Sequence, residues 1–208
     1  MCATAATRSE AANWIRLGRV RVDGREAAKA GEFIDEASSV AVDAPERYVS
    51  RAGLKLAGAA RDFGLDFSGK TVLDIGSSTG GFTDYALQHG AQKVYAVDVG
   101  TDQLHPSLRG DDRIELHEKT DIRDFRTDAP IDIIVGDVSF ISLREILPHV
   151  ARHLMQPNTI LVAMVKPQFE VGRRRLGRGG VVKDPELHVA TVLEVAAAAH
   201  GLGLGVDA

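Results

Sequence analysis

The feature that most limits the possible folds is a regular alternation of strand-like and helix-like segments from residue 70 onward. Short apolar segments typical of strands lie at 71–75, 93–97, 114–116, 131–135 and 159–165. Segments typical of helices lie at 81–89, 102–108, 142–154 and 186–200. Parallel strands need crossover connections, and those crossovers are right-handed. The order therefore predicts an α/β fold with a parallel sheet.

A smaller unit precedes this region. Apolar side chains recur at helical spacing at 11, 14, 15 and 17, and Gly18 can end this helix. Residues 19–22 alternate as a strand, and Asp23-Gly24 is a strong hairpin-turn signal. A second short strand is predicted at 40–42. We therefore predict two domains, 1–47 and 48–208.

Composition excludes several classes of protein. Hydrophobic residues make up 44% of the 208-residue chain and charged residues 26%, which is ordinary for a globular protein. No apolar run reaches the ~18 residues of a membrane span, the N-terminus does not resemble a secretory signal, and Cys2 is the only cysteine. These features predict a cytoplasmic protein without disulfides. No metal site is predicted.

Charge is unevenly distributed, although the net charge is only −4. Basic residues cluster at 8–29 and at 173–178. Each cluster could contact nucleic-acid phosphates, and each could equally be a solvated face.

The clearest motif, at 72–82, is an apolar strand followed by a glycine-rich turn and the start of a helix. It supplies the candidate cofactor-binding residues Asp74, Gly76, Ser77, Ser78, Thr79, Gly80, Gly81 and Phe82. In open α/β sheets, ligands bind beyond the carboxyl ends of the strands. The alternative is that these glycines only form a tight turn.

The pattern around this motif favours one nucleotide cofactor. The run G-S-S-T-G-G matches neither the G-x-G-x-x-G of dinucleotide sites nor the P-loop. Asp74 would repel a pyrophosphate but would attract the methionine ammonium of S-adenosylmethionine (SAM). Asp98, at the end of the next strand, could accept hydrogen bonds from ribose hydroxyls, and Asp121-Ile122 could reach the adenine. We therefore predict SAM as the cofactor.

The end of the fourth strand indicates the type of methyl transfer. The segment Asp137-Val138-Ser139-Phe140 lacks the Asn/Asp-Pro-Pro-Tyr motif of enzymes that methylate amino groups of bases. Pyrimidine C5 methylation needs a cysteine nucleophile, and the only cysteine lies far away in the sequence. Methylation of an oxygen by lysine and aspartate fits better.

Four segments together resemble a known family. They are Tyr48–Leu56, Leu73–Phe82, Asp137–Leu143 and Val165–Gly172, and they resemble the TlyA (hemolysin A-like) rRNA 2′-O-methyltransferases, relatives of FtsJ. Residues 8–43 resemble the S4 RNA-binding module. The resemblance implies a Rossmann-like SAM-dependent methyltransferase fold and methylation of cytidine ribose in ribosomal RNA. It also implies ribosomal RNA or ribosomal subunits as partners.

The related enzymes use a Lys-Asp-Lys-Glu tetrad, and Lys55, Asp137 and Lys166 match its first three members. A ribose hydroxyl is a weak acid, so a lysine can take its proton only if burial or a neighbouring cation lowers the lysine pKa. We expect Lys166 to be the base and Lys55 to stabilise the oxyanion. Asp137 is expected to orient Lys166 or to contact the sulfonium side of SAM.

Two departures from the family pattern affect these expectations. The family's glutamate lies in a segment beyond residue 208; Glu170 is a poor substitute, and Glu194 is expected mid-helix and exposed. The last strands of the sheet and the first S4 helix are also expected to be missing. Strand 159–165 would then be a bare sheet edge. We therefore expect a fragment with weak activity that still binds SAM.

RNA contacts are expected from arginines in both domains, and they would position the backbone without reading sequence. The candidates are Arg19, Arg21, Arg51, Arg173, Arg174 and Arg175. Three alternatives remain: a methyltransferase for a small molecule, a non-catalytic RNA-binding protein, and a pore-forming hemolysin. The last is disfavoured because no segment is suited to enter a bilayer.

Overall fold

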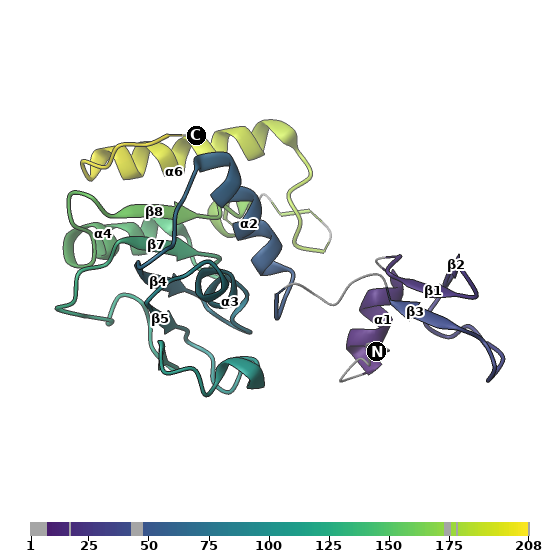
Figure 1. Ribbon diagram of the computed structural model, residues 1–208. Coiled ribbons are helices and arrows are strands. Elements are labelled where there is room, and N and C mark those ends of the chain that lie inside the picture. The colour runs from purple at the N-terminus through teal and green to yellow at the C-terminus, as the bar shows by residue number, and fades with distance from the viewer. Residues whose placement is uncertain (1–7, 17, 43–47, 173–175, 178, 208) are drawn as a thin grey trace. The chain divides into compact units, whose positions relative to one another are not determined.

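The computed structural model describes residues 8–16, 18–42, 48–172, 176–177 and 179–207. The chain divides into two compact units, Met1–Arg47 and Tyr48–Ala208, each with its own core (Figure 1).

The first unit is a helix against a three-stranded antiparallel sheet. Helix α1 spans Arg8–Arg16, and strands β1 (Val20–Val22), β2 (Arg25–Glu26) and β3 (Val40–Val42) have the order β2-β1-β3. Asp23 and Gly24 have φ angles of 50° and 80°, as a two-residue hairpin turn requires. Trp14, Val20, Val22 and Ala27 form the core. The predicted helix, hairpin and second short strand are confirmed.

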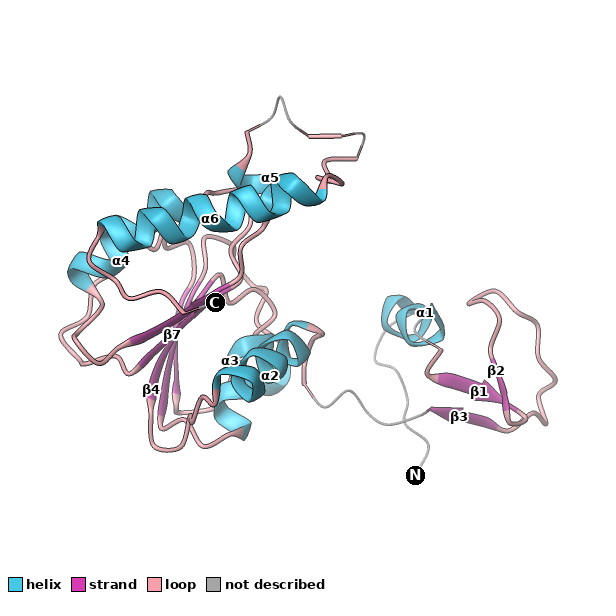
Figure 2. Ribbon diagram, turned by 90° about the horizontal axis from the view of Figure 1, so that it is seen from above, coloured by secondary structure: helices cyan, strands magenta, loops and turns pink. Residues whose placement is uncertain are grey.

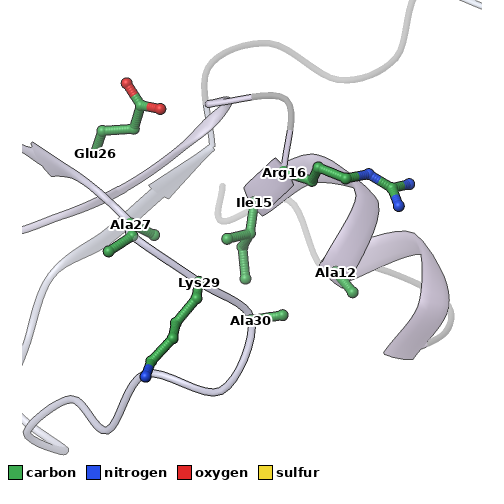
Figure 3. A pocket seen from close by; sticks show the side chains of 8 residues that line it. Ala12, Ile15, Arg16, Glu26, Ala27, Lys29 and Ala30 are labelled. Carbon is green, nitrogen blue, oxygen red and sulfur yellow. The ribbon is translucent and has the colours of Figure 1, made fainter.

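An open hollow of about 620 Å³ lies between α1 and the segment 26–30. Ala12, Ile15 and Arg16 line it from α1, and Lys29 lies on the opposite side (Figure 3). Its lining combines alanine and isoleucine side chains with the charged groups of Arg16, Glu26 and Lys29.

The second unit is built on a five-stranded parallel sheet. The strands are β4 (Thr71–Ile75), β5 (Lys93–Val97), β6 (Ile114–His117), β7 (Ile133–Gly136) and β8 (Ile160–Ala163), in the order β6-β5-β4-β7-β8. The chain runs outward from β4 to β6 and then returns to the other side of β4 with β7. In open sheets such a reversal marks a crevice at the carboxyl ends of the strands, here β4 and β7, where ligands bind.

Helices cover both faces of this sheet. Helices α2 (Ala52–Phe63) and α3 (Gly81–Gln88) lie on one face, and α4 (Leu143–His153) and α6 (Pro185–Gly201) lie on the other (Figure 2). Neighbouring strand residues face opposite sides, so Val72 joins the core under α2 and α3 while Leu73 joins the core under α4. Full burial of each such side chain stabilises the fold by about 1.5–3 kcal/mol.

The structure corrects some predicted elements. The helix predicted at 102–108 is only a short 3₁₀ turn, η1, at Pro106–Leu108. Pro106 lacks a backbone N–H, and the side chain of His105 accepts from Ser107 N, so the turn starts late. After β8, a one-turn helix, α5, spans Pro167–Glu170.

Strand β8 lies at the edge of the sheet, as predicted. Ile160 at its start is 47% exposed. Among the described residues, no helix has both the length and the apolar character needed to cross a membrane.

Candidate active site at the carboxyl ends of the strands

The glycine-rich turn after β4 depends on backbone conformations that favour glycine. Gly76 and Gly80 have φ angles of 78° and 89°. A Cβ atom on Gly80 would lie 2.6 Å from side-chain atoms of Leu104 and Leu108. The glycines therefore do form a tight turn. This turn also brings its backbone to the crevice beside β7.

Asp98 holds this turn from the neighbouring strand. One carboxylate oxygen accepts from Ser78 N at 2.8 Å, and the other accepts from Gly100 N at 2.7 Å. The Ser78 hydroxyl donates to Gln103 Oε1 at 3.0 Å. Asp98 is partly exposed, so its remaining lone pairs are available to ligand hydroxyls.

Asp74 lies deeper than its predicted role suggested. It is 1% exposed, and its Oδ2 accepts from Thr83 N at 3.0 Å and from Thr83 Oγ1 at 2.7 Å. The carboxylate therefore anchors the start of α3. Burial raises the pKa of Asp74 to about 7 despite the hydrogen bonds from Thr83, and the negative charges of Asp137 and Asp98 add to the rise.

Two buried polar atoms beside the turn have no hydrogen-bond partner among the described residues. They are Asp74 Oδ1 and Ser77 Oγ. Buried polar atoms in native proteins are nearly always paired. These two atoms fit a site whose polar ligand would complete the pairing.

The predicted adenine-side residues follow β6. Arg123 binds the Asp121 carboxylate through Nε at 2.9 Å and Nη2 at 2.6 Å, and these hydrogen bonds lower the pKa of Asp121. Ile122 is 6% exposed and packs in the core under α4. Phe82 is 5% exposed and packs under α2. The Ile122 and Phe82 side chains are therefore core residues, which leaves their backbone for any ligand.

Three charged residues from distant parts of the chain meet at the crevice. Lys55 Nζ lies 2.8 Å from Asp137 Oδ2, and Lys166 Nζ lies 2.6 Å from Asp137 Oδ1. Lys55 belongs to α2, Asp137 follows β7, and Lys166 follows β8. The structure thus brings together all three predicted catalytic residues around one carboxylate.

The electrostatics of this cluster depend on the central aspartate. Its side chain is 14% exposed, and burial alone would raise the pKa of Asp137. Hydrogen bonds from Lys166 and Lys55 outweigh burial and leave the pKa of Asp137 below its usual value. The carboxylate is therefore charged and lies between the two lysine side chains. Lys55 is the more exposed lysine, at 45% against 17% for Lys166.

The segment before α2 determines where Lys55 lies. Val49 N donates to Asp84 Oδ2 of α3 at 2.7 Å. Gly53 packs so closely on Tyr48 that a Cβ atom would lie 2.5 Å from the ring. Gly81 likewise leaves room for Ser50. These contacts fix α2 on α3, and α2 carries Lys55 to Asp137.

Sequence reasoning missed several residues beside Lys166. Its Nζ also donates to Ser139 Oγ at 2.9 Å and lies 6.0 Å from the centre of the Phe169 ring. Phe140 is 92% exposed, has a φ of 67°, and lies 5.2 Å from Phe169 between ring centres. A bulky residue at positive φ is uncommon and clusters at functional sites, but backbone angles are not visible in a sequence.

Two family models match the chain: the S4 domain at residues 5–39 and the FtsJ-like methyltransferase at residues 48–204. The chain belongs to the FtsJ-like methyltransferase family. This agrees with the glycine turn, the parallel sheet and the Lys–Asp–Lys cluster.

Individual relatives of this FtsJ-like methyltransferase are similar over most of its length. A candidate rRNA methyltransferase of Bacillus subtilis, YqxC, is 47% identical over 88% of this chain and 67% of its own. The 16S/23S rRNA (cytidine-2′-O)-methyltransferase TlyA of Mycobacterium tuberculosis is 42% identical over 96% of this chain and 76% of its own. A solved structure of a candidate hemolysin from Streptococcus thermophilus is 41% identical, with a TM-score of 0.78, and the match covers 98% of this chain and 76% of that one.

The predicted RNA-binding arginines of this FtsJ-like methyltransferase lie on both units. Arg19 is partly buried just before β1, and Arg21 is exposed on β1, where it also donates to Gly24 O at 3.4 Å. Arg51 is exposed at the start of α2. Arg173, Arg174 and Arg175 lie outside the described residues.

Proposed function

We propose that this chain transfers the methyl group of SAM to a ribose 2′-oxygen of cytidine in ribosomal RNA. The observation that carries the proposal is the Lys55–Asp137–Lys166 cluster beside the glycine turn. A methyltransferase for amino groups or for pyrimidine carbons would need different side chains at this place.

The residues around the glycine turn are suited to hold SAM. Asp98 would accept from the ribose hydroxyls, and Asp121 with the backbone at Ile122 would face the adenine. Asp74 Oδ1, Ser77 Oγ and the turn's backbone would face the methionine end. SAM, when bound, supplies an activated methyl group, so positioning of the acceptor accounts for much of the rate.

The chain's own residues would prepare the ribose oxygen. Lys166 first releases a proton to solvent, and its neutral Nζ then takes the proton from O2′. Lys55 donates an N–H to the developing alkoxide from the exposed side of the cluster. Asp137 orients both lysines and balances the positive charge beside it.

Two observations support RNA as the substrate: the S4 unit and the names of the relatives. The S4 unit presents Arg21 for contact with backbone phosphates. The Mycobacterium tuberculosis relative carries rRNA and cytidine in its name, which supports the same substrate here. A ribosomal substrate would place the reaction in the cytoplasm.

The decisive experiment is transfer of a tritiated methyl group to unmodified ribosomal subunits. We expect transfer by the wild-type chain, and a loss of roughly 10²–10⁴-fold in Asp137→Asn, because that variant leaves two lysines without their shared counterion. Asp128→Asn, in the exposed loop before β7, is the matched control and should keep full activity. The proposal fails if wild-type chain that binds SAM transfers no methyl group to RNA.

A further inference from the structure

Glu170 is a buried acidic residue that the proposed reaction does not use. It ends the one-turn helix α5, and its side chain is 2% exposed. In the sequence it is only part of the segment Val165–Gly172, and that segment alone assigns no function to its carboxylate.

Its carboxylate binds the first turn of another helix. Oε1 accepts from Leu143 N at 2.6 Å, and Oε2 accepts from Ser142 Oγ at 2.5 Å. Arg144 Nε also lies 3.3 Å from Oε2. Ser142 is itself the N-cap of α4 and accepts from Arg144 N at 3.1 Å. Glu170 therefore adds a negative charge, supplied from a different segment, to the N-terminus of α4, where negative charge is favoured.

The two segments joined in this way are the ones that carry the catalytic pair. Helix α5 starts directly after Lys166 and ends at Glu170, a length of roughly 6 Å at 1.5 Å per residue. At one end, Lys166 binds Asp137; at the other, Glu170 binds the start of α4. Phe140 and Phe169 contact each other between these two points. Segment 137–144 is thus attached to α5 at both ends.

Only one of these two attachments is constant during the proposed reaction. Lys166 changes its protonation state when it accepts the ribose proton, so its ion pair with Asp137 weakens and strengthens in each cycle. The bonds of Glu170 involve no reacting atom. They can hold the separation of the two segments while the bond at the other end changes.

We propose that Glu170 is a positioning residue that holds Lys166 and Asp137 in register for proton transfer. This inference rests on the proposed function. Errors of about 1 Å in the placement of reacting groups can cost on the order of 10²-fold in rate, so a contact remote from the substrate can still affect turnover.

Glu194 provides a matched control, because it binds the same arginine, Arg144, as Glu170 does. Arg144 Nη2 donates to Glu170 O at 2.8 Å, and Nη1 donates to Glu194 Oε2 of α6 at 3.0 Å. The Glu194 side chain is 52% exposed. Glu194→Gln therefore removes a charge from the same network without touching the link between α4 and α5.

The experiment compares Glu170→Gln, Glu194→Gln and Ser142→Ala in the full chain. We measure kcat and KM for SAM and for ribosomal subunits, and the hydrogen exchange rate of the Leu143 amide. For Glu170→Gln we expect kcat to fall roughly 10–100-fold, KM for SAM to stay within about twofold, and Leu143 exchange to accelerate. Ser142→Ala should show a smaller fall in kcat, and Glu194→Gln should keep kcat within about twofold.

Other outcomes overturn the inference. If folded Glu170→Gln keeps the wild-type kcat, or if Glu194→Gln loses as much, Glu170 has only a structural role. A loss confined to KM would also contradict positioning of the reacting groups. Wild-type chain that transfers no methyl group would overturn the proposed function and this role together, whereas active wild type with an unimpaired Glu170→Gln would overturn this role alone.

Discussion

The two halves of the crevice are built in different ways. The half after β4 and β5 is made largely of backbone: the turn at 76–80 approaches the crevice, and Asp98 accepts from Ser78 N of this turn and from Gly100 N. The half after β7 and β8 is made of charged side chains, with Asp137 between Lys55 and Lys166. We infer that substitutions in the first half act through shape and stability, and that those in the second half act through charge.

The largest expected effect tests the charged half. Lys166→Met keeps much of the side-chain length but removes the proton acceptor, so kcat should fall roughly 10²–10⁴-fold. Thermal unfolding should change little, since Met fills much of the space of the lysine side chain and Lys55 still pairs with Asp137. Methyl transfer and a melting curve on the same sample measure both. Lys183→Met, at an exposed position, is the control. A large loss of stability with kcat preserved in the folded fraction would contradict the comparison.

A smaller effect is expected where the two halves meet, at Asp74. Its pKa is raised from 3.8 to about 7, so the native state binds this proton more tightly than the unfolded state does. The wild type should therefore lose stability, relative to Asp74→Asn, as pH rises from about 4 to about 7, and the difference should then level off. The expected size is up to about 4 kcal/mol, at 1.36 kcal/mol per pKa unit.

Urea denaturation of both proteins at pH 5 and pH 8 measures this difference. The side-chain amide oxygen that Asp74→Asn introduces can still accept from Thr83 N, so the comparison isolates the charge. A difference in unfolding free energy that is the same at both pH values would show that Asp74 does not titrate in this range.

The smallest effect concerns the backbone half. Gly80→Ala places a methyl group against Leu104 and Leu108 at a φ of 89°, so we expect a loss of about 1–3 kcal/mol in the free energy of unfolding. SAM affinity should fall while kcat at saturating SAM stays near the wild-type value. Gly110→Ala is the control, because a Cβ atom there meets nothing within 4 Å. If Gly80→Ala had normal SAM affinity and a reduced kcat, the inference that this half acts through shape and stability would be wrong.

How far the sequence predicts this protein depends on whether a feature is local. The five strands were found because each is a short apolar run, and the Asp23-Gly24 turn was found because its two residues favour positive φ. The helix expected at 102–108 was wrong because Pro106 and the His105 side chain limit it to one 3₁₀ turn. The role of Asp74 was judged from its charge and its position before Gly76, which do not reveal that its carboxylate faces Thr83.

The sequence by itself determined the alternation of strands and helices, the glycine turn and the residue types available for chemistry, because these depend on neighbours a few positions apart. Only the tertiary structure decided that Lys55 and Lys166 share the carboxylate of Asp137, that Glu170 binds the start of α4, and that Phe140 is exposed beside Phe169. Such contacts join residues tens of positions apart. They depend on sheet order and helix packing, which the local pattern of residues does not specify.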